Sequence, residues 1–171
     1  MSLAIGALLL AIGCLALLLG LWLWRRSGLP MGRVIYSDTR AWQPNMRTFV
    51  SPRYRLVGRP DYLVQTTRGV VPVEVKSTRA PAQPYASHLM QIAAYCLLIE
   101  ESFGKPPYGI ICYTDRQFAV DYTPGLREML IATLRAMREA LHAGCADRSH
   151  AETARCQGCG YRDRCDQALT L

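Results

Sequence analysis

The chain has 171 residues, half of them hydrophobic, and a formal net charge of +7 from 20 basic and 13 acidic residues. This composition excludes collagen-like, disordered and disulfide-scaffold proteins. Beyond its apolar N-terminal stretch, the chain is long enough for one ordinary domain with a sizeable core.

The N-terminal stretch Leu3–Trp24 contains no charged side chain. As a helix it would extend roughly 33 Å, enough to cross a hydrocarbon core about 30 Å thick. Its two tryptophans lie at the end that Arg25 and Arg26 follow, and basic residues mark the cytoplasmic side of a membrane. We therefore expect residues 1–26 to form a single transmembrane anchor, with the N-terminus outside and the remaining chain in the cytoplasm.

The positive charge is concentrated directly after this anchor. Residues 25–60 hold eight arginines and one acidic residue, which accounts for the whole excess of +7. Such a block can contact membrane lipid headgroups or a nucleic-acid backbone. Three of these arginines, Arg53, Arg55 and Arg59, lie shortly before Asp61 in the sequence. We expect these three to contact nucleic acid.

The hydrophobic pattern predicts a basic linker over residues 27–53, which prolines interrupt, and an alternation of strands and helices from residue 54 onward. The predicted strands are Val34–Tyr36, Tyr54–Val57, Tyr62–Thr66, Val70–Ser77, Tyr108–Tyr113 and Phe118–Tyr122. The predicted helices are Ala86–Phe103, before Gly104, and Pro124–His142, before Gly144. This order favours an α/β core over residues 54–144, with a mixed central sheet flanked by helices.

The candidate site lies on the predicted strands. Glu74 and Lys76 are two residues apart, so their side chains leave the same face of the sheet, and Asp61 opens the preceding strand. Two carboxylates at a sheet edge can hold a divalent cation, and a lysine beside them can orient the water that attacks a phosphodiester. Gln91 and Tyr95 are four residues apart on one helix face and can hold a substrate nearby.

The C-terminal tail, residues 145–171, is rich in cysteine. Its spacing C-x-x-C-x(5)-C comprises Cys156, Cys159 and Cys165. In a reducing compartment this spacing indicates a metal site in preference to disulfides. The fourth ligand would be Cys145 or His150, and the set suits zinc as well as an iron–sulfur cluster.

These motifs resemble a known family. G-R-P-D at 58–61, E-V-K at 74–76 and Q-I-A-A-Y at 91–95 are similar to the PD-(D/E)xK nucleases, in particular the RecB-type and CRISPR-associated exonuclease branch. The resemblance covers about two thirds of the chain and implies a restriction-endonuclease-like fold. It implies Mg²⁺ or Mn²⁺ bound by Asp61, Glu74 and the backbone carbonyl of Val75. It also implies a catalytic role for Lys76, with Gln91 and Tyr95 positioning the substrate.

The resemblance extends to the cysteines, for which it implies a [4Fe-4S] cluster, with Zn²⁺ as the alternative. Together the motifs favour a membrane-tethered, metal-dependent DNA nuclease, expected to act as an exonuclease on single-stranded DNA or DNA ends. Many members of the branch carry a metal-binding histidine upstream of the aspartate, whereas the first histidine here is His88. The alternative is therefore a weakly active or inactive nuclease-fold module that binds nucleic acid or a protein partner at the membrane.

Overall fold

The computed structural model describes residues 6, 9–10, 12–16, 18–19, 33–35 and 42–169. The chain divides into two compact units, Met1–Ala132 and Thr133–Leu171. The strands are β1 (Arg33–Ile35), β2 (Trp42–Pro44), β3 (Phe49–Ser51), β4 (Leu56–Gly58), β5 (Tyr62–Thr66), β6 (Gly69–Val75), β7 (Tyr108–Cys112) and β8 (Gln117–Asp121). The helices are α2 (Ala86–Phe103), α3 (Pro124–Ala143), α4 (Thr153–Gln157) and the 3-10 helix η2 (Arg162–Arg164).

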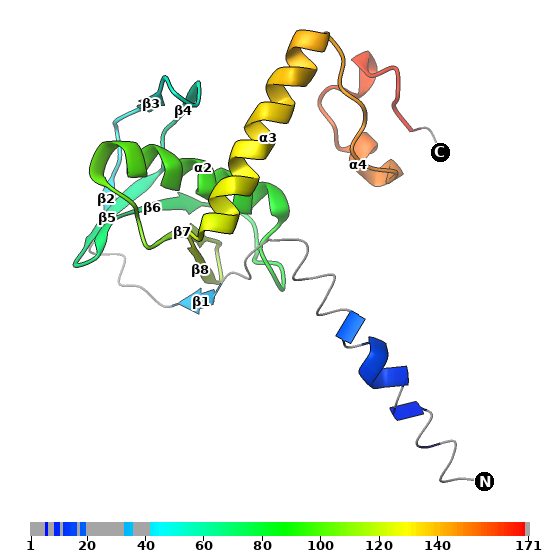
Figure 1. Ribbon diagram of the computed structural model, residues 1–171, viewed down its shortest axis with the longest axis horizontal. Coiled ribbons are helices and arrows are strands. Elements are labelled where there is room, and N and C mark those ends of the chain that lie inside the picture. Colours follow the sequence, from blue (N-terminus) through cyan, green and yellow to red (C-terminus); the bar gives the residue numbers. More distant parts are fainter. Residues whose placement is uncertain are drawn as a thin grey trace. The chain divides into compact units, whose positions relative to one another are not determined.

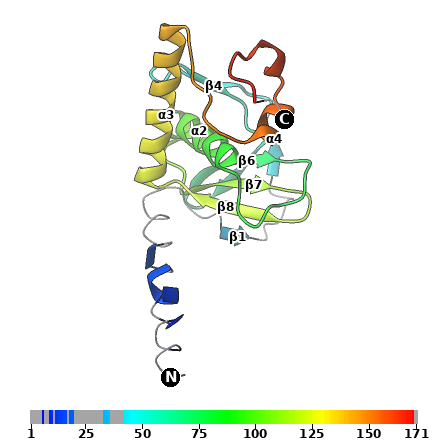
Figure 2. The ribbon, with the colours of Figure 1, turned by 90° about the vertical axis from the view of Figure 1, so that its right-hand side faces the viewer.

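Six strands of the first unit form one mixed sheet in the order β1-β8-β7-β6-β5-β2. Strands β6 and β7 run parallel, and the other neighbours are antiparallel. A parallel pair needs a crossover connection, which α2 supplies. The helix lies across one face of the sheet, over β6 and β7 (Figure 1, Figure 2).

The core lies on both faces of this sheet. On the α2 side, Phe49, Leu98 and Ile99 are buried together. On the other side, the odd-numbered residues of β6 pack with β7, because alternate side chains of a strand point to opposite faces. Val71 and Val73 are fully buried there. Glu74 follows Val73, faces α2 on the opposite side of the sheet, and is itself buried.

The periodic elements lie close to their predicted positions. Strand β5 and helix α2 have the predicted bounds, and α3 is one residue longer than predicted. Helix α2 ends at Gly104, whose φ of 95° favours glycine, as the sequence pattern indicated. The mixed α/β core with flanking helices is therefore confirmed.

The region predicted to be an irregular linker contains two further strands. β2 pairs antiparallel with β5, and β3 pairs antiparallel with β4 as a separate hairpin. The strand predicted at Tyr54–Val57 begins only at Leu56, because Tyr54 and Arg55 form the turn of that hairpin. Three-residue strands are too short to show a hydrophobic period, and Pro44 suggested a break instead.

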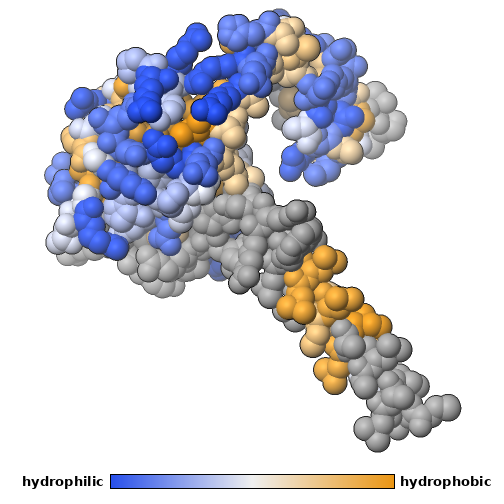
Figure 3. All heavy atoms as spheres, in the orientation of Figure 1, coloured by the Kyte–Doolittle hydropathy of each residue, from blue (hydrophilic) through white to orange (hydrophobic). Residues whose placement is uncertain are grey.

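Most of the expected membrane span, Leu3–Trp24, lies outside the described residues. The described positions 6, 9–10, 12–16 and 18–19 are helical, and Figure 3 shows hydrophobic side chains gathered there. Within the described part of the chain, no helix is long and apolar enough to cross a membrane.

Candidate active site

The bend between β4 and β5 sets the position of Asp61. Asn45, directly after β2, holds this bend: its Nδ2 donates to the carbonyl oxygen of Pro60 at 3.0 Å, and its backbone N–H donates to the carbonyl oxygen of Asp61 at 2.9 Å. The backbone N–H of Val75, at the end of β6, donates to Asp61 Oδ2 at 2.8 Å. The predicted approach of Asp61 to the Glu74–Lys76 segment is therefore present.

Glu74, Lys76 and Gln91 form a closed polar cluster beneath α2. Lys76 Nζ donates to Glu74 Oε1 at 2.8 Å and to Gln91 Oε1 at 2.7 Å. Gln91 Nε2 donates to Glu74 Oε1 at 2.7 Å and to the Tyr95 hydroxyl at 3.1 Å. The Gln91 amide thus turns its oxygen, an acceptor, to the Lys76 ammonium and its NH₂, a donor, to the Glu74 carboxylate. A flipped amide would place the NH₂ against the ammonium and the oxygen against the carboxylate.

Burial shifts the pKa values of two groups in this cluster. The pKa of Glu74 is raised by burial, and the nearby charge of Asp61 raises it further, while hydrogen bonds from Lys76 and Gln91 act in the opposite direction. Burial also raises the pKa of Tyr95, so its hydroxyl stays protonated at neutral pH. Two carboxylates that repel one another, one of them buried, are a donor set suited to a hard divalent cation.

Mg²⁺ is commonly held by one or two carboxylates, with waters completing its shell. Asp61 and Glu74 fit this pattern. Among the residues that the structure describes, no group of three or more His, Cys, Asp or Glu side chains is arranged to hold a metal ion. Any cation at Asp61 and Glu74 would therefore depend on waters or backbone oxygens for its remaining ligands.

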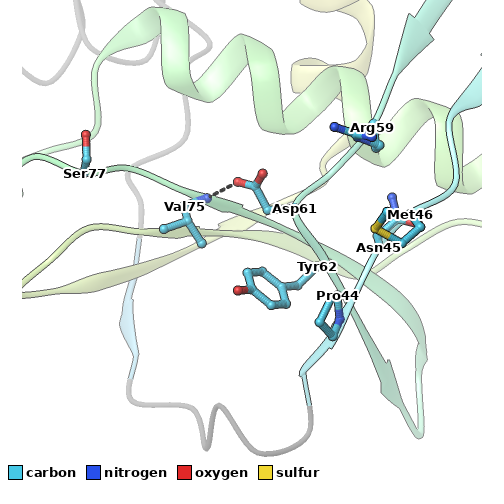
Figure 4. Close-up of a pocket in the computed structure, with 8 residues that line it drawn as sticks. All are labelled: Pro44, Asn45, Met46, Arg59, Asp61, Tyr62, Val75 and Ser77. Carbon is cyan, nitrogen blue, oxygen red and sulfur yellow. Dashed lines mark hydrogen bonds between the residues drawn. The ribbon is translucent and has the colours of Figure 1, made fainter.

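Asp61 also lines a groove of about 530 Å³ (Figure 4). It is lined by Pro44, Asn45, Met46, Arg59, Asp61, Tyr62, Val75 and Ser77. In Figure 4 the Asp61 carboxylate points toward the backbone N–H of Val75, and a dashed line marks the hydrogen bond between them. Asp61 thus lines the groove and also accepts a hydrogen bond from Val75, the residue between Glu74 and Lys76.

The three arginines predicted to bind nucleic acid take different positions. Arg59 follows β4 and lines the groove beside Asp61. Arg53 and Arg55 lie in the turn between β3 and β4, where the Arg53 guanidinium stacks 5.3 Å from the Tyr54 ring centroid. Arg59 alone among the three therefore lines the groove.

In the second unit, a cavity of about 400 Å³ gathers the three cysteines of the tail. Cys156, Cys159, Cys165 and His150 line it together. Cys145 lines a different pocket, on the C-terminal half of α3. Of the two fourth ligands that the sequence left open, His150 lines the same cavity as the cysteine triplet, although these four described side chains are not arranged to hold a metal ion in this structure.

Asn45 is the site residue that sequence reasoning missed. It contacts residues 15 and 16 positions along the chain, and no local period or motif links them. The only local signal was an Asn-x-Arg turn, closed by Asn45 Oδ1 accepting from the Arg47 N–H at 3.0 Å.

Comparisons with known proteins agree with this geometry. A family model described as the PD-(D/E)XK nuclease superfamily matches residues 19–166. The CRISPR-associated exonuclease Cas4 of Francisella tularensis subsp. novicida (strain U112) is 32% identical over 117 residues. That match covers 68% of this chain and 59% of the relative.

Among solved structures, that of SSO0001 shares 21% sequence identity and a TM-score of 0.48, over 72% of this chain and 58% of that chain. The family model covers most of the chain, including Asp61, Glu74, Lys76 and the cysteine triplet. The chain belongs to the PD-(D/E)XK nuclease superfamily.

Proposed function

We propose that this protein is a metal-dependent deoxyribonuclease that hydrolyses phosphodiester bonds at Asp61, Glu74 and Lys76. The observation that carries the proposal is the hydrogen-bonded cluster in which Lys76 Nζ lies 2.8 Å from Glu74 Oε1 and 2.7 Å from Gln91 Oε1. Asp61 is close enough to Glu74 to raise its pKa. A lysine held this tightly beside two carboxylates suits proton transfer and charge neutralisation at a phosphate.

The carboxylates of Asp61 and Glu74, with the backbone carbonyl of Val75, would hold Mg²⁺ or Mn²⁺. Such an ion, when bound, polarises the phosphate and lowers the pKa of an attacking water. Lys76 then orients that water and neutralises charge that develops on the phosphate oxygens. Gln91 holds both Lys76 and Glu74 in place, and the Tyr95 hydroxyl holds the Gln91 amide.

DNA is the proposed substrate, and removal of nucleotides from an end is the proposed mode of cleavage. The groove beside Asp61 offers a positively charged side chain, Arg59, for the backbone and an aromatic ring, Tyr62, for a base. The mode of cleavage is supported by the relative named as an exonuclease. The chain spans 59% of that relative's length, so the relative's remaining sequence has no counterpart in the match.

The test uses the full-length chain purified in detergent, with end-labelled single-stranded DNA, double-stranded DNA and RNA of one sequence. Cleavage in Mg²⁺ or Mn²⁺, abolished by EDTA and by Glu74→Gln, is expected. A product pattern of mononucleotides from the start of the reaction indicates an exonuclease, and internal fragments indicate an endonuclease. A folded protein that binds DNA and cleaves none of the three substrates would instead support the binding-module alternative.

For the tail we propose a metal cofactor bound by Cys156, Cys159, Cys165 and His150. Three cysteines and one histidine suit zinc, and the family resemblance favours a [4Fe-4S] cluster. The shared cavity supports His150 over Cys145 as the fourth ligand. Metal analysis and the visible absorption spectrum of anaerobically purified protein distinguish the two cofactors. His150→Ala is expected to lower the metal content, and Cys145→Ala is expected to leave it unchanged.

We also propose that the apolar N-terminal segment tethers the nuclease unit to the cytoplasmic face of a membrane. The absence of charge from Leu3 to Trp24 and the basic residues that follow support this. Sedimentation with membranes in high salt, compared with a chain shortened by residues 1–24, tests the anchor. Release of the full-length chain by salt alone would contradict it.

A further inference from the structure

His88 lies beside the polar cluster and is not used by the proposed reaction. It is in the first turn of α2, three residues before Gln91, so the two side chains leave neighbouring positions on the helix. Its Nδ1 lies 2.7 Å from the hydroxyl of Tyr113, which directly follows β7. Tyr113 is only 3% exposed, so this hydroxyl is a fixed partner.

The groups around His88 come from three elements. They are Lys76 after β6, Tyr113 after β7, and Tyr85 at the start of α2, whose ring meets the imidazole edge-on at 5.3 Å. Burial and the nearby charge of Lys76 lower the pKa of His88. The imidazole is therefore neutral at pH 7, next to a lysine that is paired with Glu74.

The contact with Tyr113 engages His88 Nδ1 and leaves Nε2 as the ring nitrogen available to a ligand. Burial raises the pKa of the Tyr113 phenol, so the phenol keeps its proton at neutral pH and can donate it to Nδ1. A neutral imidazole that accepts at Nδ1 carries its own proton on Nε2, which makes Nε2 a donor.

We propose that His88 is a second phosphate-binding residue of the site: its Nε2–H donates to a phosphate oxygen of the nucleic-acid strand that Lys76 contacts. Lys76 and Tyr113 follow adjacent parallel strands at their carboxyl ends, where ligands of α/β sheets bind. The first turn of α2 carries no acidic side chain that would repel a phosphate. The inference rests on the proposed nuclease function, because it assumes a phosphodiester at Lys76.

Nuclear magnetic resonance of the histidine rings tests this without any cleavage. The chain has three histidines, so the His88 ring is readily assigned by substitution. In EDTA, nitrogen chemical shifts are expected to show the Nε2–H tautomer and a pKa below 6.5. A saturating single-stranded oligonucleotide is expected to raise that pKa by about one unit, because a phosphate favours the charged imidazole. His142, on α3, is the control, and its ring signals are expected not to respond to the oligonucleotide.

Kinetic variants give a second readout. His88→Phe keeps a ring between Tyr85 and Tyr113 and removes the donor, so KM for DNA is expected to rise roughly tenfold with kcat nearly unchanged. His88→Gln keeps a hydrogen-bond donor, so its KM for DNA is expected to rise less than that of His88→Phe. His142→Gln is the matched control.

The results separate this inference from the proposed function. An Nδ1–H tautomer, or a His88 pKa that DNA binding does not move, overturns the role of His88 even when the protein cleaves DNA. A His88 pKa that rises with bound DNA, in a protein that cleaves nothing, supports the inference and contradicts the nuclease. Failure to bind DNA at all overturns both.

Discussion

The pairing of Glu74 with Lys76 predicts that stability depends on pH in a specific way. Lys76→Met removes the ammonium and keeps most of the side-chain volume. The side chains of Lys76 and Glu74 are 19% and 10% exposed, so the pair is largely shielded from solvent. Two charge-assisted hydrogen bonds are lost, partly offset because the lysine no longer needs to be desolvated. At pH 8 we expect a cost of about 2 kcal/mol in the free energy of unfolding.

The cost should shrink as the pH falls. The pKa of Glu74 is raised in the folded state by burial, so its ionisation destabilises the fold as the pH rises through that value. Lys76 opposes this rise, and without it the pKa of Glu74 goes higher still. Below the unfolded pKa of the carboxyl, Glu74 is protonated in both states. The difference between wild type and Lys76→Met should then fall below about 1 kcal/mol near pH 4.

Urea denaturation from pH 4 to pH 8 measures this difference. The double variant Glu74→Gln with Lys76→Met has no charge left to desolvate and is expected to lose the pH dependence and regain stability. Lys105→Met, which removes the only other lysine, is the control and should not show the dependence on pH. A cost of Lys76→Met that is the same at every pH would refute the assigned electrostatics.

Three further predictions concern the scaffold. Gly109→Ala would place a Cβ in a steric clash with Ile92 on α2, so the melting temperature of the variant should drop, with a cost of about 1–3 kcal/mol. An unchanged melting temperature would contradict this packing. Arg127→Met breaks a 2.9 Å ion pair with Glu100, and urea titration should show a loss of about 1–2 kcal/mol. Asn45→Ala should slow DNA cleavage with little change in melting temperature. Full activity would exclude a role for Asn45 in placing the bend that carries Asp61.

The periodic parts of this fold are predictable from the sequence. Strand β6 reads as an alternating segment that ends near the candidate catalytic residues, so Glu74 and Lys76 were expected on one face, and their 2.8 Å contact confirms it. Helix α2 was predicted because an apolar face and a terminal glycine mark its bounds. Local patterns specify these elements, so the elements can be recognised without knowledge of the tertiary fold.

Contacts that depend on tertiary folding were not predictable. Gln91 was expected to hold a substrate, and no pattern in the sequence showed that it bridges Lys76 and Glu74, 15 and 17 residues away. Asn45 and the strand β2 that precedes it lie in a segment with no hydrophobic period. His88 carried no motif, because the residue that its Nδ1 contacts, Tyr113, lies 25 residues further on.

We propose that Asp61 and Glu74 together make a metal-dependent nuclease site. Single-turnover cleavage of labelled single-stranded DNA in Mg²⁺ by Asp61→Asn tests it most directly, beside Asp121→Asn at the exposed end of β8. We predict that Asp61→Asn lowers the cleavage rate at least about a hundredfold with the fold intact, while Asp121→Asn retains the wild-type rate. Equal rates for Asp61→Asn and wild type, or loss of activity in both variants alike, would contradict the account.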